Sequence, residues 1–221
     1  MLKFTFSLLL ALVGFGAIAQ EQPQQTTVPE SSGLRIGVDF AKYVYQIVEP
    51  NITGFEASLD YEIKRNYFLT VEGGYERALP QSDLYNYELT GAYGRVGLDY
   101  NILKKRADND IVFLGLRYGL SNYTQSAREI QINSYWGSSI LAVPTENLTA
   151  HWAEAVIGMK VELFFAKNLF IGWTLRGRLL VAGNKYETLQ PFTIPGYGNS
   201  ETKATIGATW SLYYNIPVRF N

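Results

Sequence analysis

The sequence predicts an all-β protein: an eight-stranded antiparallel up-and-down transmembrane β-barrel with a polar, filled interior. Three observations lead to this prediction. After residue 32, apolar and polar residues alternate with a period of two through most of the chain. The connections between these segments are alternately short and long. The polar face of these segments carries arginines and carboxylates in similar number.

Eight segments show the alternation expected of β-strands that have one apolar and one polar face. Eight strands make a barrel whose interior is just filled by side chains. No stretch combines a 3.6-residue period with helix caps, so the sequence predicts no substantial helix. The predicted strands cover residues 34–41, 53–63, 67–76, 86–100, 111–121, 151–164, 169–181 and 203–220.

The last segment has the most regular alternation. A soluble barrel turns its apolar face inward, whereas a membrane barrel turns that face to lipid. The composition of the polar face therefore distinguishes a soluble barrel from a membrane barrel. Here the apolar face carries Trp210, Leu212, Tyr214, Ile216 and Val218, and the polar face carries Thr209, Ser211, Asn215 and Arg219.

The polar face has the composition of an enclosed ion network. It uses arginine rather than lysine, and the planar guanidinium can pair with two carboxylates at once. Arg176 and Arg178 should have a carboxylate within salt-bridge reach, from Glu154, Glu162, Asp60 or Glu72. The predicted lumen network comprises Arg35, Glu56, Asp60, Glu72, Arg95, Arg117, Glu154, Lys160, Glu162, Arg176, Arg178 and Arg219.

Aromatic residues gather near the ends of the predicted strands, as the interfacial girdles of membrane barrels do. One girdle is expected at the rim with the short turns, and the other at the opposite rim. The candidates are Tyr67, Phe68, Phe164, Phe165, Phe170 and Phe220 for the first, and Tyr43, Tyr75, Tyr123 and Trp152 for the second.

The connections alternate in length, as in barrels of bacterial outer membranes. The short ones are 64–66, 101–110 and 165–168, and the long ones are 42–52, 77–85, 122–150 and 182–202. The last two long connections place tyrosine and tryptophan among small residues, which favours a recognition surface. Packing over the barrel mouth is the alternative. The candidate interaction residues are Tyr123, Tyr135, Trp136, Phe192 and Tyr197.

The N-terminus has the pattern of a secretory signal peptide. Residues 1–19 combine Lys3, an apolar stretch and an Ala-Ile-Ala cleavage site. Residues 20–32 are polar and predict a flexible periplasmic lead-in. The expected organisation is therefore a signal peptide (1–19), a lead-in (20–32) and a barrel (33–221), exported to the bacterial outer membrane.

Composition excludes several functions. The chain has no cysteine and one histidine, which excludes disulfides, thiol catalysis and a poly-histidine metal site. The net charge is −1, so no global field points to nucleic acid. The sequence predicts no cofactor and no metal.

His151 is the weak catalytic candidate. It lies where the sixth strand leaves the longest connection, with Glu154 three residues on and Ser121 and Ser126 across that connection. An enzyme at the outer rim that acts on lipid or lipopolysaccharide is one alternative function. A narrow channel lined by the lumen charges is another. A rim histidine without chemistry and a lumen filled by ion pairs are the simpler interpretations.

Several stretches resemble a family of small outer-membrane barrels from Bacteroidota, which is a domain-of-unknown-function family. These stretches are "LRIGVDFAK", "GLRYGLS", "SYWG", "AHWAEAVIGMKVE", "LFIGWTLRGRLLV" and "IPGYG". The resemblance runs from about Leu34 to Phe220. It implies an outer-membrane barrel and transfers no catalytic residue.

The pattern as a whole favours a non-enzymatic protein with a structural or interaction role. The expected partners are outer-membrane lipid and other outer-membrane or surface proteins, which would bind through 122–150 and 182–202. One form of this role is an accessory subunit of a larger outer-membrane complex.

Overall fold

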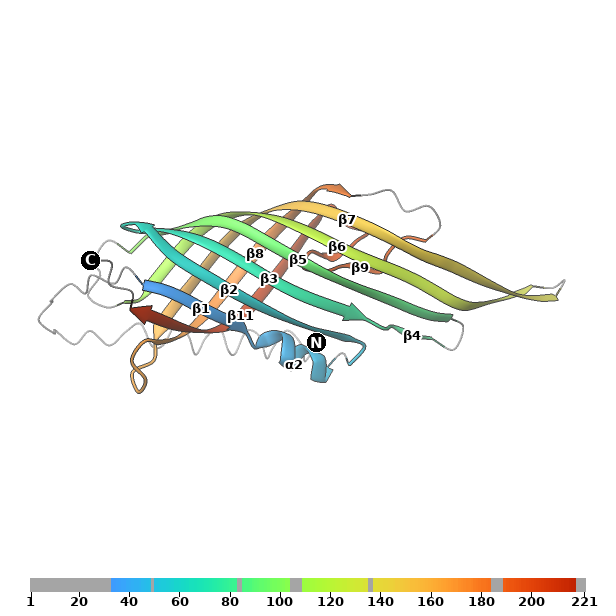
Figure 1. The fold of residues 1–221 in the computed structure, drawn as a ribbon, viewed down its shortest axis with the longest axis horizontal. Helices are drawn as coiled ribbons and strands as arrows, with labels where there is room; N and C mark the ends of the chain where they lie inside the picture. Colours follow the sequence, from blue (N-terminus) through green and yellow to red (C-terminus); the bar gives the residue numbers. More distant parts are fainter. Residues whose placement is uncertain are drawn as a thin grey trace, which may run out of the picture.

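The chain forms a closed antiparallel barrel (Figure 1). The computed structural model describes residues 33–48, 50–82, 85–103, 109–134, 137–183 and 189–217. Each long strand pairs with the next along the chain, and the first pairs with the last, from Gly33 opposite Pro217 to Asp39 opposite Ser211. The eight long strands of this described part are β1 (Gly33–Asp39), β2 (Ile52–Lys64), β3 (Tyr67–Ala78), β5 (Tyr85–Asn101), β6 (Ile111–Ser134), β7 (Gly137–Glu162), β8 (Leu169–Gly183) and β11 (Ala204–Pro217).

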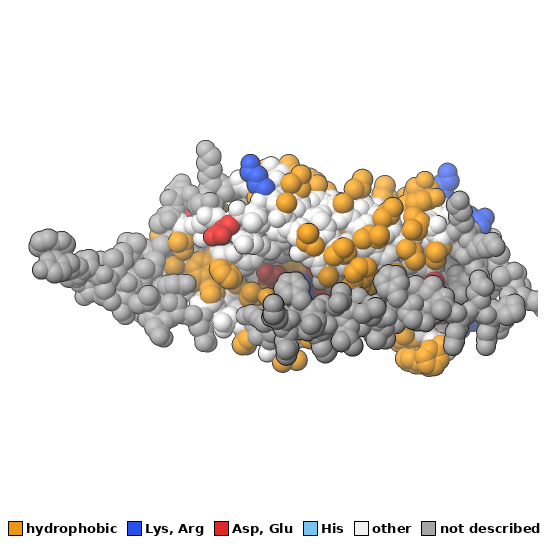
Figure 2. Space-filling model, turned by 180° about the vertical axis from the view of Figure 1, so that it is seen from behind, with side chains coloured by type: hydrophobic (Ala, Val, Ile, Leu, Met, Phe, Trp, Pro, Cys, Tyr) orange, Lys and Arg blue, Asp and Glu red, His pale blue; other side chains and the backbone are white. Residues whose placement is uncertain are grey.

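The two faces of the wall have opposite character. Apolar side chains point outward and are exposed, and Figure 2 shows hydrophobic side chains spread over the barrel wall. In β11, Leu212 and Tyr214 are exposed while Thr209, Ser211 and Asn215 are buried, as their parity predicts. An apolar exterior around a charged interior is the arrangement of a transmembrane barrel. The predicted fold class is therefore confirmed.

The short turns are built on two asparagines. Asn66 ends the β2–β3 turn with φ of 71°, and Asn168 ends the β7–β8 turn with φ of 65°. Asparagine tolerates this left-handed conformation better than most residues. In both turns a glutamate at the end of the preceding strand accepts the asparagine N–H: Glu62 at 3.0 Å and Glu162 at 2.7 Å. We call this the short-turn end of the barrel and the opposite one the long-loop end.

One short helix lies at the long-loop end, where the sequence predicts no substantial helix. It is α2 (Ala41–Val48), and its first N–H bonds to the Asp39 carboxylate at 2.9 Å. Lys42 and Gln46, one turn apart, share the face toward the barrel, while Ile47 is exposed. Eight residues are too few to carry a clear 3.6-residue period, which explains the omission. No helix in the described part of the chain is long and apolar enough to cross a membrane.

The predicted loop at 122–150 is wrong. β6 and β7 continue as a paired hairpin up to Ser134 opposite Gly137, with register shifts near Ala127. β5 accompanies β6 as far as Arg128, and β8 accompanies β7 as far as Ala150. We call the section beyond these limits, residues 129–134 and 137–149, the arm. Figure 1 shows this hairpin projecting well past the other strands.

The remaining elements are small. β4 (Gln81–Ser82) pairs with the start of β5, while β9 (Thr193–Ile194) and β10 (Gly198–Asn199) form a hairpin in the last long connection. This connection bends into the barrel mouth, and we call residues 189–203 the inward loop. It positions much of the candidate site described below.

The assignment of the apolar face to lipid and of the polar face to the lumen can be tested by substitution. Leu212→Arg on the lipid side should lower the free energy of unfolding by about 2–4 kcal/mol if the residue lies near the bilayer midplane. Thr209→Arg should also destabilise, but through crowding, because Thr209 is 6% exposed and bonded by Arg176. Denaturant titration of the barrel in lipid vesicles measures both. Glu201→Arg is the control, because Glu201 is exposed near the end of the inward loop. An equal loss of unfolding free energy at positions 201 and 212 would contradict the membrane assignment.

Candidate functional site

A buried carboxylate at mid-height of the lumen binds three guanidiniums. Glu72 of β3 accepts hydrogen bonds from Arg95 of β5 at 2.9 Å, from Arg176 of β8 at 2.5 Å, and from Arg117 of β6. In the closed strand order, β3 and β8 lie on opposite sides of the ring. The Glu72–Arg176 bridge therefore crosses the lumen. All four side chains are at most 3% exposed.

Two further carboxylates complete this layer. Glu56 lies 2.9 Å from Arg95 and accepts the Tyr93 hydroxyl at 2.5 Å. Glu154 lies 3.0 Å from Arg95 Nε, 3.3 Å from Arg178 Nε and 3.7 Å from Arg176 Nη1. Glu72 and Glu154 thus supply the carboxylates expected beside Arg176 and Arg178.

A second layer lies nearer the short-turn end. Lys160 of β7 pairs with Asp60 of β2, and these two strands also face each other across the ring. The Thr70 hydroxyl lies 2.9 Å from Asp60 and 3.0 Å from Asp99, and Asp99 in turn pairs with Arg117 at 2.9 Å. Buried charges are tolerated only when paired and hydrogen-bonded. In the two layers each charged side chain has at least one partner of opposite charge.

Other members of the predicted network lie elsewhere. Arg35 is buried near the short-turn end, with its guanidinium 5.3 Å and 5.1 Å from the rings of Phe68 and Phe170. Glu162 is not part of the lumen clusters, because its carboxylate bonds the β7–β8 turn and Asn109. Arg219 lies outside the described residues.

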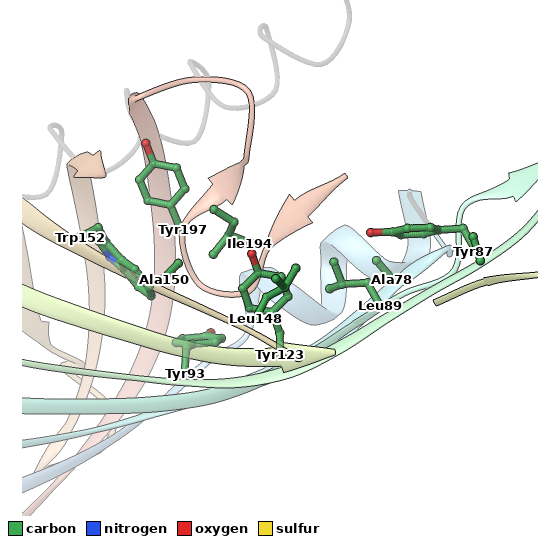
Figure 3. Packing of buried hydrophobic residues seen from close by; sticks show 11 residues of the cluster. Ala78, Tyr87, Leu89, Tyr93, Tyr123, Leu148, Ala150, Trp152, Ile194 and Tyr197 are labelled. Atoms are coloured by element: carbon green, nitrogen blue, oxygen red, sulfur yellow. The ribbon is translucent and has the colours of Figure 1, made fainter. Parts of the chain in front are cut away.

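The lumen near the long-loop end is apolar. Eleven buried residues pack there, and two of them, Ile194 and Tyr197, come from the inward loop (Figure 3). The Trp152 and Tyr197 rings lie 5.9 Å apart. The other members are Ala78, Tyr87, Leu89, Tyr93, Tyr123, Ala127, Leu148, Ala150 and Trp152.

The inward loop is fixed to the charged layer beneath it. Arg95 Nη2 donates to the Gly196 carbonyl at 2.8 Å, and Arg178 Nη1 donates to the Tyr197 carbonyl at 3.0 Å. Gly196 has φ of +78°, and a Cβ there would lie 2.5 Å from the Tyr93 ring, so a side chain would displace the loop. Burial raises the pKa of the Tyr197 hydroxyl, which donates to the Thr202 carbonyl at 2.7 Å. The barrel mouth is thereby capped.

These contacts correct two of the proposed interaction residues. Tyr123 is 4% exposed and Tyr197 is 0% exposed, so both belong to the interior packing and not to an outer surface. Phe192 does lie on the outside, at 58% exposed. Tyr135 and Trp136 lie outside the described residues.

The girdle prediction is correct for some residues and wrong for others. Tyr67, Phe164, Phe165, Tyr43 and Tyr75 are exposed, as a girdle requires. Phe68, Phe170, Tyr123 and Trp152 point inward and are buried, because each has the opposite parity on its strand. Phe220 lies beyond the described residues. The alternation along each strand distinguishes the two groups, whereas nearness to a strand end does not.

His151 does not meet the groups proposed to assist it. Trp152 and Glu154 point into the lumen, so strand alternation turns His151 outward, where its ring lies 6.1 Å from that of Tyr118. Ser121 is buried inside the barrel. The histidine is therefore separated by the barrel wall from Glu154 and Ser121. Ser126 has the outward parity, but it lies six residues along β6 from Leu120, the strand partner of His151. Within the described ranges, no group of three or more His, Cys, Asp or Glu side chains could hold a metal ion.

The central carboxylate should dominate stability. Glu72→Gln removes the negative charge that three buried guanidiniums share, and it should lower the free energy of unfolding by about 3–5 kcal/mol. The double variant with Arg176→Gln should cost less than the two single costs summed, because the groups are directly coupled. Denaturant titration in vesicles measures each. Glu88→Gln breaks an exposed pair with Arg77 and is the control, at about 1 kcal/mol or less. An equal loss at 72 and 88 would refute the central role.

The chain matches one protein family and is similar to several solved structures. None of the curated proteins compared with the chain matches it. Among solved structures, the chain is similar to CarO of Acinetobacter baumannii (11% identity, 88% of this chain and 100% of that one covered, TM-score 0.40). It is also similar to the N-terminal barrel domain of Pseudomonas aeruginosa OprF (13%, 84% and 98%, TM-score 0.34) and to Acinetobacter baumannii CarO2 (11%, 83% and 97%, TM-score 0.37). The family model described as "Domain of unknown function (DUF6048)" matches residues 1–220, and the chain therefore belongs to that family.

Proposed function

We propose that this protein is a non-enzymatic outer-membrane barrel that binds another outer-membrane or surface protein through its arm. The observation that carries the proposal is the extension of β6 and β7 past their neighbouring strands. In one form of this role, the barrel is an accessory subunit of a larger complex.

The exterior supports a location in a membrane. Exposed apolar side chains on neighbouring strands, such as Val71, Leu98 and Leu116, would be costly in water but stable against lipid tails. The expected signal peptide at 1–19 would export the chain, and closed barrels of this kind serve bacterial outer membranes. Outer-membrane lipid is then the first partner.

The interior supports a structural rather than a catalytic or conducting role. The lumen is crossed by Glu72–Arg176 and Asp60–Lys160, and it is capped by the inward loop. A path for solutes would have to break these buried ion pairs. A rim enzyme would need His151 beside an acid or a nucleophile, and the barrel wall separates it from Glu154 and Ser121.

The arm has the backbone features of a docking element. Among the described residues, β8 pairs with β7 no further than Ala150, so the outer edge of 137–148 has no neighbouring strand in this part of the chain. Such an edge offers a row of backbone donors and acceptors to an incoming strand. The base of the arm is held in place, because Gln125 donates to Glu146 at 2.9 Å and to the Leu189 carbonyl at 2.7 Å. Exposed Phe192 lies in the inward loop that Gln125 holds.

Shortening the arm tests the proposal. Residues 129–141 are replaced by Asn-Gly, a two-residue hairpin turn, which keeps the pairing of β6 with β5 up to Arg128. The barrel should still fold and show heat-modifiable migration on gels, because its lumen network is intact. A photoreactive residue at position 132 of the full-length chain identifies the partner by cross-linking in native membranes. That partner should no longer co-purify with the shortened chain.

The matched control is Arg77→Gln, an exposed outer residue on β3 that is paired with Glu88. It should retain the cross-linked partner at the wild-type level. If the same partner co-purifies equally with the shortened chain, the interaction surface lies on the barrel wall or at the short-turn end, and the arm proposal fails.

A further inference from the structure

The barrel wall has a gap at the long-loop end between β2 and β11. β1 ends at Asp39, and its pairing with β2 stops at Val38 opposite Ala57. The stretches 52–56 of β2 and 204–210 of β11 continue beyond that point with no strand between them in the described chain. Helix α2 lies over this gap, and Gln46 satisfies one exposed strand carbonyl by donating to Gly54 at 2.6 Å. The helix thus takes the place of a missing strand end.

A cavity of about 450 Å³ lies behind the helix. It is bounded by α2, by the ends of β2 and β11 that have no strand between them, and by the inward loop, and it reaches the charged layer at Arg95 and Arg178. Its size is within the range of small-molecule sites. A second cavity of about 650 Å³ shares Tyr45, Ile52, Thr193 and Asn199 with the first. The second is lined largely by apolar groups, among them Pro191 and Phe192.

Arg178 is the group in the first cavity that is able to bind a ligand. Its Nη1 donates to the Tyr197 carbonyl and its Nε lies 3.3 Å from Glu154, whereas Nη2 has no hydrogen-bond partner among the described residues. Glu154 is already shared with Arg95 and Trp152. The guanidinium lies over Gly207 of β11, where a Cβ would be 2.8 Å from Nη1 and Nη2. Glycine at 207 therefore keeps this side of the guanidinium open.

The charges around the cavity restrict the ligand. Lys42 is paired with Glu76 at 3.4 Å and lies 4.8 Å from the Tyr93 ring centre. Arg95 donates to Glu56, Glu72 and the Gly196 carbonyl, and its Nε lies 3.0 Å from Glu154. Arg178 Nη2 is thus a donor that is available to a ligand, while Asp39, Glu56 and Glu76 line the same cavity. These carboxylates would repel a head group with two negative charges. A head group with a single negative charge suits Arg178.

We propose that the two joined cavities bind a single-chain amphiphile with a carboxylate head group, of the fatty-acid class. The carboxylate binds Arg178 in the cavity behind α2. The alkyl chain follows the shared residues Tyr45 and Ile52 into the second cavity, beside Pro191 and Phe192. Helix α2 covers the head group from the outside.

Binding of laurate labelled with ¹³C at the carboxyl carbon tests this proposal. The full barrel is placed in phosphatidylcholine nanodiscs, at a pH at which laurate is ionised, and empty nanodiscs give the reference carboxyl shift. One equivalent should show a separate carboxyl signal. Arg178→Gln should weaken binding by about tenfold or more, because a hydrogen bond to a charged group is lost. Gly207→Ala should weaken it as well, by displacing the guanidinium.

Two matched variants should bind laurate as the wild type does. Arg77→Gln removes an outer arginine away from the cavities, and Gly177→Ala adds a methyl group opposite Ile206 on the lipid side, where its nearest contact is at 4.0 Å. Heat-modifiable migration shows whether each variant is folded. If Arg178→Gln does not fold, Gly207→Ala decides.

Several outcomes would overturn the proposal. Laurate binding that is unchanged in Arg178→Gln or, where that variant does not fold, in Gly207→Ala would place the ligand elsewhere. Equal affinity for dodecanol would show that the charge is not recognised. Displacement of laurate by acetate or inorganic phosphate at the same concentration would show a site for small anions instead of an amphiphile.

Discussion

The carboxylate of Glu72 links four strands of the barrel from the inside. It joins guanidiniums from β5, β6 and β8 to β3, and one of these strands stands directly across the ring. A charge buried this deeply is tolerated only when it is fully paired. The strand count, the inward parity of each arginine and the small residues beside them all follow from bringing these groups within hydrogen-bond reach. The apolar exterior follows as well, since alternation leaves it no other face.

The same layer determines what can happen at the long-loop end. Arg95 and Arg178 each donate one hydrogen bond upward, to the Gly196 and Tyr197 carbonyls. The inward loop therefore rests on the ion network, and the apolar cluster around Trp152 and Tyr197 closes over it. Gln125 then links this loop to the base of the arm. Both proposed binding elements, the arm and the cavities behind α2, are positioned by this chain of contacts.

The sequence was sufficient for the barrel and its faces, because lipid and an ion-filled lumen impose a strict period of two. It was insufficient for the arm. Beyond Leu120 the inward side chains of β6, such as Tyr123, join an apolar cluster, and the outward ones, such as Asn122, are polar. The polarity of the two faces is therefore reversed relative to the membrane-facing wall, and with its register shifts this part of the hairpin has the composition of a loop. Tyr123 and Tyr197 show the same limit in the candidate site. A tyrosine among small residues suits a recognition surface and an interior cap equally well, and which of the two forms depends on whether the chain bends inward.

The gap between β2 and β11, beyond the end of β1, is the weakest part of the barrel wall. β1 has 7 residues, whereas β5, another strand of the wall, has 17. The short strand leaves backbone groups of β2 and β11 without a neighbour, which would be costly against hydrocarbon. Helix α2 reduces that cost from outside through Gln46, and it sends Lys42 inward to Glu76 and the Tyr93 ring. A helix held by a few side-chain contacts is easier to displace than a strand held by a backbone ladder. In the proposed amphiphile site, this part of the wall, where the pairing is weakest, is therefore the entry to Arg178.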